Sequence, residues 1–135
     1  MARAFLDTNV LVYAFSEDPR ADAATALLGG GHDTGVQALN EFTNVARRKL
    51  GMSWPEIRQG LADIRLLCRT VHSLDVATHE EAVTLAADHG FSFCDALIVA
   101  AALRAGCGVL HSEDLQHGRM IGSLRINNPF LASAQ

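Results

Sequence analysis

The stretch from Arg3 to Tyr13 constrains the fold of this 135-residue chain more than any other part of it. Its sequence, Arg-Ala-Phe-Leu-Asp-Thr-Asn-Val-Leu-Val-Tyr, begins with a short apolar run that stops at Asp7 and resumes at Val10. A buried strand that ends on a carboxylate and passes directly into a helix is typical of α/β proteins, which present charged groups at one edge of the sheet. Aspartate is also a favoured helix N-cap, so for Asp7 taken alone we favour a purely structural role, and the rest of the chain has to decide.

Length and composition predict one folded domain over residues 1–135. Apolar residues make up 49% of the chain and charged residues 19%, which allows a real core and argues against disorder. The formal net charge of −4 has the wrong sign for a protein that binds nucleic acid over a wide basic face. Any nucleic-acid function must therefore rest on a local site.

Three widely spaced cysteines, Cys68, Cys94 and Cys107, form no Cys-x-x-Cys pair. An odd number without that spacing suggests neither a disulfide framework nor a zinc site. The sequence also shows no basic segment followed by a long apolar one, and no apolar run of membrane length. We therefore expect a cytoplasmic protein with reduced cysteines and no membrane partner.

Apolar periodicity and turn residues predict strands that alternate with helices. Strands are expected over residues 4–6, 32–36, 70–74, 109–110 and 125–126. Helices are expected over residues 21–28, 37–50, 55–68, 78–88 and 95–105. Two capping boxes, Ser53-Trp54-Pro55-Glu56 and Thr78-His79-Glu80-Glu81, mark the expected starts of two of these helices. The alternation implies an α/β fold with an open parallel sheet and right-handed crossovers.

Four carboxylates fall where such a fold gathers functional side chains. Asp7 and Asp114 each come just past the carboxyl end of a predicted strand, the edge at which open parallel sheets bind ligands. Glu41 lies on the amphipathic helix after the second strand, and Asp95 begins an apolar helix. If these four positions converge, the cluster cannot stay ionised in a partly dry pocket without cations, and carboxylate oxygens suit Mg²⁺ or Mn²⁺.

Each of these acids also has a structural interpretation that the spacing leaves open. Glu41 fits a solvated helix residue, Asp95 fits an N-cap, and Asp114 fits a turn former. The basic residues near the end of the same helix are equally ambiguous. Arg48 shares a face with Glu41 and could bind a substrate phosphate, or could simply complement the helix dipole, which is the interpretation we favour for Lys49.

Four segments, in order, resemble a PIN-domain protein, and in particular a VapC-type toxin ribonuclease of a bacterial toxin–antitoxin pair. They are Phe-Leu-Asp-Thr-Asn-Val-Leu-Val-Tyr-Ala at 5–14, Leu-Asn-Glu-Phe at 39–42, Phe-Cys-Asp-Ala-Leu-Ile-Val-Ala-Ala-Ala at 93–102, and Leu-His-Ser-Glu-Asp-Leu-Gln-His-Gly at 110–118. The resemblance extends to Ile-Asn-Asn-Pro-Phe at 126–130 and so covers nearly the whole chain. It implies a single PIN-like domain with strand order 3-2-1-4-5 and a site between the first and fourth strands.

The resemblance also implies the site residues and partners. The metal-site and catalytic acids carried over are Asp7, Glu41, Asp95 and Asp114. Ser112 matches the small hydroxyl or amide residue that often precedes the last acid, and Asn9 is expected to order the turn after the first strand. Similar proteins are homodimers that cleave RNA with a divalent metal and are inhibited by a small antitoxin, which holds its tail in a groove over the active site.

Two positions depart from the family pattern. Cys94 stands where an aromatic residue often precedes the third acid, so pocket packing or substrate stacking is expected to differ there. His111 stands where an apolar residue or threonine is more usual, and we favour a strand-end residue bonded to backbone over one that touches the site. Neither departure removes a carboxylate.

The sequence thus predicts a metal-dependent endoribonuclease, a hydrolase in which Mg²⁺ or Mn²⁺ activates water for attack on phosphorus. Asp95 is the most plausible of the four acids to act as a base. Two alternatives stay open. One is a phosphatase or phosphotransferase with an aspartyl nucleophile, although Asn9 replaces the second aspartate that such sites usually carry. The other is a catalytically idle interaction module on the same fold.

Overall fold

Six strands form one sheet in the part of the chain that the computed structural model describes, residues 3–131. The strands are β1 (Ala4–Leu6), β2 (Asp33–Gly35), β3 (Thr70–His72), β4 (Val109–His111), β5 (Met120–Ile121) and β6 (Leu124–Asn127). The helices over the same residues are α1 (Thr8–Ala14), α2 (Ala21–Leu28), α3 (Val36–Arg48), α4 (Trp54–Leu67), α5 (Val76–His89) and α6 (Phe93–Arg104).

The order of the strands in the sheet is β3-β2-β1-β4-β6-β5. The first five strands of this order are parallel, which confirms the expected 3-2-1-4-5 arrangement when β6 is taken as the fifth parallel strand. The short β5 was not expected; it pairs antiparallel with β6 at the edge of the sheet. Gly122, at a φ of 59°, allows the tight turn between them, and a two-residue strand carries no periodic signal from which it could have been predicted.

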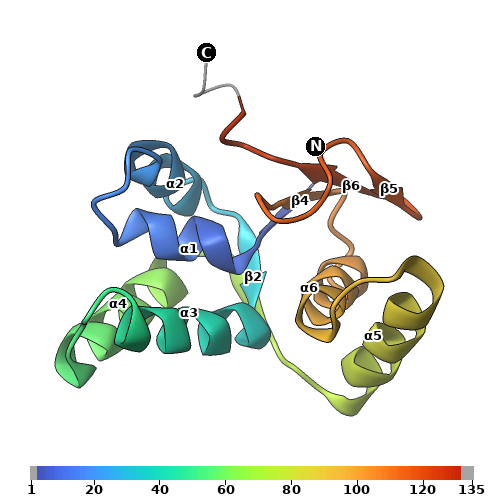
Figure 1. Cartoon of the computed structure of the whole chain (residues 1–135), viewed down its shortest axis with the longest axis horizontal. Coiled ribbons are helices and arrows are strands. Elements are labelled where there is room, and N and C mark those ends of the chain that lie inside the picture. The colour runs from blue at the N-terminus through green and yellow to red at the C-terminus, as the bar shows by residue number, and fades with distance from the viewer. Residues whose placement is uncertain (1–2, 132–135) are drawn as a thin grey trace.

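Helices cover both faces of the sheet, as parallel strands require. Figure 1 shows α1 to α4 gathered on one side and α5 with α6 on the other. All three residues of β1 are buried, and α6 is buried continuously from Ala96 to Ala102. This confirms the prediction that the apolar helix lies in the interior, although it begins at Phe93, two residues earlier than expected.

Helix starts depend on which polar side chain reaches the free N–H groups of the first turn. The capping box at Ser53 and Glu56 is formed as predicted. The second predicted box at Thr78 is wrong, because α5 begins at Val76 and the side chain of Asp75 accepts the Thr78 N–H at 2.8 Å. Asp75 comes earlier in the chain than Thr78 and is the N-cap of α5. Thr78 therefore lies buried inside the first turn of this helix.

Within residues 3–131 no single helix is long and apolar enough to span a membrane. The joined pair α5 and α6, which would meet the length and composition together, is bent by 117°.

Candidate active site

Asp7 and Ser112 are the residues that directly follow the neighbouring parallel strands β1 and β4. Leu6 is paired with His111, and the Asp7 N–H continues the pairing by donating to the His111 carbonyl oxygen at 3.0 Å. The next residue of each strand therefore lies side by side with its neighbour. The Ser112 hydroxyl donates to Asp7 Oδ2 at 2.6 Å, and the Thr8 N–H donates to Oδ1 at 2.6 Å.

The position of this pair in the sheet is where parallel α/β folds bind ligands. From β1 the chain builds outward through β2 to β3, then returns to place β4 on the other side of β1. The connections leaving β1 and β4 diverge at that point and leave a crevice at the carboxyl ends of the two strands. Asp7 and Ser112 lie at the base of this crevice, and Asp114 follows on the same loop.

Glu41 and Asp114 line one cavity of about 330 Å³ at this edge of the sheet. Helix α3 starts directly after β2 and runs past the crevice, which brings Glu41 to it from the side. The Gln37 side chain, one turn earlier, donates to Glu41 Oε2 at 3.0 Å. The other residues that line the cavity come from α1 and α3: Thr8, Asn9, Val12, Tyr13, Val45 and Lys49.

Asp95 approaches from α6 and does not line this cavity. Ser92, and not Asp95, is the N-cap of α6, since its hydroxyl accepts the Asp95 N–H at 3.2 Å. The interpretation of Asp95 as an N-cap is therefore wrong, and its partly buried carboxylate is left without a capping role.

The charges of Asp95 and Asp114 influence the other two acids. Burial raises the pKa of Asp7 to about 7, and the charges of Asp114 and Asp95 add to the rise. Burial also raises the pKa of Glu41, with further contributions from Asp95 and Asp114. The pKa of Asp95 is raised by burial and by Asp114. The negative charges of Asp95 and Asp114 therefore make Asp7 and Glu41 harder to ionise.

The chemistry of these donors fits a hard divalent cation, since carboxylate oxygens are the ligands that Mg²⁺ and Mn²⁺ prefer. The four carboxylates do not form a complete metal-binding site in this structure: among residues 3–131 no group of three or more His, Cys, Asp or Glu side chains is close enough to hold a metal ion.

Asn9 and Ser112, the two supporting residues expected from the sequence, both connect α1 to the loop after β4. The Asn9 side-chain oxygen accepts the Glu113 N–H at 3.4 Å. Its amide nitrogen is buried beside the cavity and has no hydrogen-bond partner among the described residues. Asn9 therefore links the start of α1 to the loop after β4 through its side-chain oxygen.

The structure places Lys49, and not Arg48, in the lining of the cavity. Glu41, Val45 and Lys49 follow one another at four-residue steps along α3, so they form one stripe of the helix. Arg48 is exposed and lies outside this lining. The helical spacing of Lys49 was visible in the sequence, but the same residue equally suited the end of the helix.

The two departures from the family pattern have different surroundings. The Cys94 side chain is largely exposed. The part of it that is buried, and then the charges of Glu41 and Asp95, raise the pKa of its thiol. The His111 ring lies within 3.0 Å of the Asn127 side-chain nitrogen, through Nδ1, so its partner is a side chain and not backbone as we favoured. Burial, with smaller effects of His32 and Arg125, lowers the pKa of His111 to about 4.

Sequence reasoning assigned no role to a buried carboxylate at the opposite edge of the sheet. Asp33, at the start of β2, is paired with Arg3, with Arg69 at 3.5 Å and with His72 at 2.9 Å. Burial acts to raise the pKa of Asp33, but the bonds from His72 and Arg3 bring it below its usual value. These three partners satisfy the carboxylate, so it fastens β2 and β3 to the start of β1.

Comparison with known proteins identifies relatives over most of the chain. The family model described as "PIN domain" matches residues 4–121. A search of curated protein sequences gave no significant match. Among solved structures, Mycobacterium tuberculosis VapC20, described as a Sarcin-Ricin loop cleaving toxin, is 21% identical with a TM-score of 0.66, over 82% of this chain and 89% of that one.

Two further solved structures cover still more of the chain. A toxin–antitoxin complex from Klebsiella pneumoniae is 17% identical with a TM-score of 0.70, over 93% of this chain and 97% of that one. FitAcB from Neisseria gonorrhoeae is 19% identical with a TM-score of 0.63, over 95% and 99%. At such identities these likenesses establish the shared fold.

Proposed function

This chain belongs to the PIN-domain family, and from that premise we propose that it is a metal-dependent endoribonuclease, the toxin of a toxin–antitoxin pair. The observation that carries the proposal is the buried Asp7 held by Ser112 where β1 and β4 end, with the charges of Asp95 and Asp114 acting on it. The description of VapC20 as a Sarcin-Ricin loop cleaving toxin, and the toxin–antitoxin complexes among the structural neighbours, support it. We propose that it acts in the cytoplasm.

Asp7, Glu41, Asp95 and Asp114 would hold the cation, Mg²⁺ or Mn²⁺. When bound, such an ion activates water and stabilises the charge on a phosphodiester during hydrolysis. Asp95 would accept a proton from the attacking water as its oxygen bonds to phosphorus and the bond to the leaving oxygen breaks. The raised pKa of Asp95 suits a base better than an ordinary exposed carboxylate does.

The remaining polar groups of the cavity would bind the RNA backbone. The Lys49 ammonium offers a positive charge on the cavity, where it can bind a phosphate oxygen. Arg48, one residue away, would bind a phosphate further along the strand. These contacts recognise phosphate and not base identity, which leaves target choice to other parts of the surface.

The purified protein should cleave RNA in the presence of Mg²⁺ or Mn²⁺ and lose that activity in EDTA. Asp7→Asn, Glu41→Gln and Asp95→Asn should each reduce cleavage by at least about tenfold, as removal of a metal ligand or its support does. Glu81→Gln, a carboxylate on α5 paired at 3.9 Å with Arg104, is the matched control and should cleave like wild type. Full activity of the Asp7 variant would refute the site assignment.

The antitoxin would bind both the acidic crevice and a neighbouring apolar cavity. A cavity of about 270 Å³ lies between α1, α2 and α4, and its lining includes Phe15, Leu28, Leu66 and Leu67. Leu66 is 83% exposed, which is unusual for a large apolar side chain without a partner. We propose that an apolar antitoxin segment fills this cavity and that an arginine or lysine of the antitoxin enters the crevice. We also propose that the toxin is a homodimer.

A further inference from the structure

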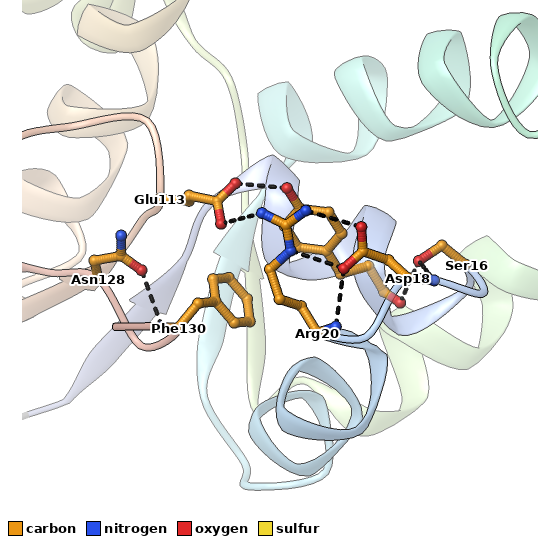
Figure 2. Close-up of polar contacts among 7 residues, drawn as sticks. Ser16, Asp18, Arg20, Glu113, Asn128 and Phe130 are labelled. Atoms are coloured by element: carbon orange, nitrogen blue, oxygen red, sulfur yellow. Dashed lines mark hydrogen bonds and ion pairs between the residues drawn. The ribbon is translucent and has the colours of Figure 1, made fainter. Parts of the chain in front are cut away.

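In the sequence, Glu113 lies between Ser112 and Asp114, the two residues of the loop after β4 that serve the candidate active site. Ser112 holds Asp7, and Asp114 lines the cavity. Both oxygens of Glu113 are used: Oε1 accepts from the Tyr13 hydroxyl at 2.5 Å, and Oε2 accepts from Arg20 at 2.7 Å. Figure 2 shows Glu113 and Arg20 facing each other across the gap between the loop and the start of α2.

Contacts with Asp18 and Tyr13 restrain the Arg20 side chain in addition to its bond with Glu113. Its guanidinium donates twice to Asp18, through Nε at 2.7 Å and through a terminal nitrogen at 2.8 Å, and its backbone N–H donates to the same carboxylate at 2.9 Å. The guanidinium also lies 4.3 Å from the centre of the Tyr13 ring, a cation–π distance. The donor that reaches Glu113 therefore has little freedom to move away (Figure 2).

Tyr13 connects this arrangement to the candidate active site. Its side chain lines the same cavity as Glu41 and Asp114, and its ring packs edge-on against Phe130 with centroids 5.2 Å apart. Burial, and then the bond to Glu113, raises the pKa of Tyr13 to about 12. The hydroxyl thus stays protonated and remains a donor at physiological pH.

We infer that Tyr13, Arg20 and Glu113 form a latch that positions the Ser112–Asp114 loop, so that Ser112 stays bonded to Asp7 and Asp114 faces the cavity. The three are positioning residues. The inference rests on the proposed function, since it concerns the geometry of the same site. Charge-assisted bonds such as those at Glu113 are stronger than neutral ones. By contrast, the bonds that backbone N–H groups of the loop donate to side chains, Glu113 to Asn9 and Leu115 to Ser112, are both 3.4 Å long.

Tyr13→Phe is the sharpest test, because it removes one bond to Glu113 and leaves the ring and every charge in place. We expect the full-length variant to keep KM for RNA within about twofold and to lose about tenfold in kcat, as loss of a support behind a metal ligand does. Its affinity for Mn²⁺, measured by titration, should fall severalfold. Hydrogen exchange of the amides at 112–115 should accelerate at least about fivefold, while amides of α5 stay unchanged.

Glu113→Ala and the double variant Tyr13→Phe/Glu113→Ala test whether the residues act as a unit. If they do, the double variant should cleave RNA no more slowly than Glu113→Ala alone, because the acceptor of the Tyr13 hydroxyl has already been removed. Glu81→Gln again removes one partner of an ion pair away from the site, and it should leave cleavage, Mn²⁺ affinity and loop exchange as in wild type. Independent, multiplying losses in the double variant would overturn the latch.

Hydrogen exchange separates failure of the latch from failure of the proposed function. If wild type does not cleave RNA, the proposed ribonuclease activity is wrong, and the latch is then judged by loop exchange alone. Unchanged exchange at 112–115 in Tyr13→Phe would overturn the latch whatever the activity. Accelerated exchange with wild-type kcat and Mn²⁺ affinity would also overturn it, because the loop would then move without consequence for the site.

Discussion

Each carboxylate oxygen of Asp7 accepts a hydrogen bond, but the side chain is buried, which disfavours its negative charge. Two hydrogen bonds stabilise its ionised form, yet burial outweighs them and raises its pKa from 3.8 to about 7. A carboxylate in this condition gains more from a bound cation than an exposed one does, because the cation replaces the solvent that burial removed. Asp7, the N-cap of α1, is therefore also a carboxylate whose ionised form is disfavoured by burial.

The pH dependence of stability tests this environment in metal-free protein. Since the folded form binds a proton at Asp7 more tightly than the unfolded chain does, stability should fall as pH rises from about 4 through about 7. The side chain introduced by Asp7→Asn is neutral at every pH, so this variant does not lose stability in this way as the pH rises. In EDTA, its free energy of unfolding should exceed that of wild type by at most roughly 4 kcal/mol at about pH 8, and the gap should narrow toward about pH 5.

Urea unfolding of both proteins across this pH range gives the measurement. A constant difference between wild type and Asp7→Asn at all pH values would mean that Asp7 titrates near its ordinary pKa. Such a result would also remove the argument that the crevice is poised to bind a cation.

At the scale of elements, the helices around the site are set by local caps and by close packing. Helix α4 carries Gly60 at a buried interior position, where glycine costs helix stability. A Cβ at this position would meet the rings of Phe15 and Phe42 at 3.5 Å, an ordinary contact distance. The site therefore has room for alanine without rearrangement.

Gly60→Ala should therefore stabilise the protein by about 0.5 to 1 kcal/mol, a rise of roughly 2 to 4 °C in Tm. Gly90→Ala is the contrasting variant, because Gly90 ends α5 at a φ of 72°, a conformation that alanine adopts only with strain. It should lower Tm. Thermal unfolding followed by circular dichroism compares the two, and a lower Tm for Gly60→Ala would show that the contact with the two rings is too tight.

For the whole molecule, the shared carboxylate region predicts how metal and stability are linked. A cation that binds only the folded protein adds about 1.4 kcal/mol when present at roughly ten times its Kd. Tm should then rise by about 3 to 5 °C for a domain of this size. Asp95→Asn removes one charge from the region, so it should melt higher than wild type in EDTA and gain less from Mn²⁺.

Because Ser92 caps α6, the behaviour of Asp95→Asn reports on charge and not on capping. A thermal scan of both proteins, with EDTA and with Mn²⁺, gives the four values that are needed. Equal Tm values in EDTA together with equal shifts on adding Mn²⁺ would exclude Asp95 from a shared site.

The proposed homodimer is a second property of the whole molecule. Several large apolar side chains are exposed on one chain, among them Val76 and Val83 on α5, and a partner copy could cover such a surface. Light scattering at micromolar concentration should give twice the monomer mass of 14.5 kDa. A strictly monomeric species under these conditions would contradict the proposal.

The sequence by itself determined the features that depend on neighbouring residues. Apolar periodicity located the helices and the parallel strands to within a few residues, because burial of one face leaves its pattern in the local sequence. The same pattern put Asp7 and Asp114 just past strands β1 and β4. The error at this level, a cap at Thr78 in place of Asp75, came from two nearby residues that could both form the cap. The capping alternative for Asp95 was left open for the same reason, because Ser92 lies close by.

Only the tertiary structure decided which distant residues meet. Tyr13 and Glu113 are 100 residues apart, and Arg20 and Glu113 are 93 apart, so no local pattern could pair them. The choice of Lys49 over Arg48 for the cavity depends on the rotation of α3 against α1, which packing fixes. A hydrogen bond or an electrostatic field acts through space, and the chain reveals such neighbours only after strand order and helix packing have brought them together.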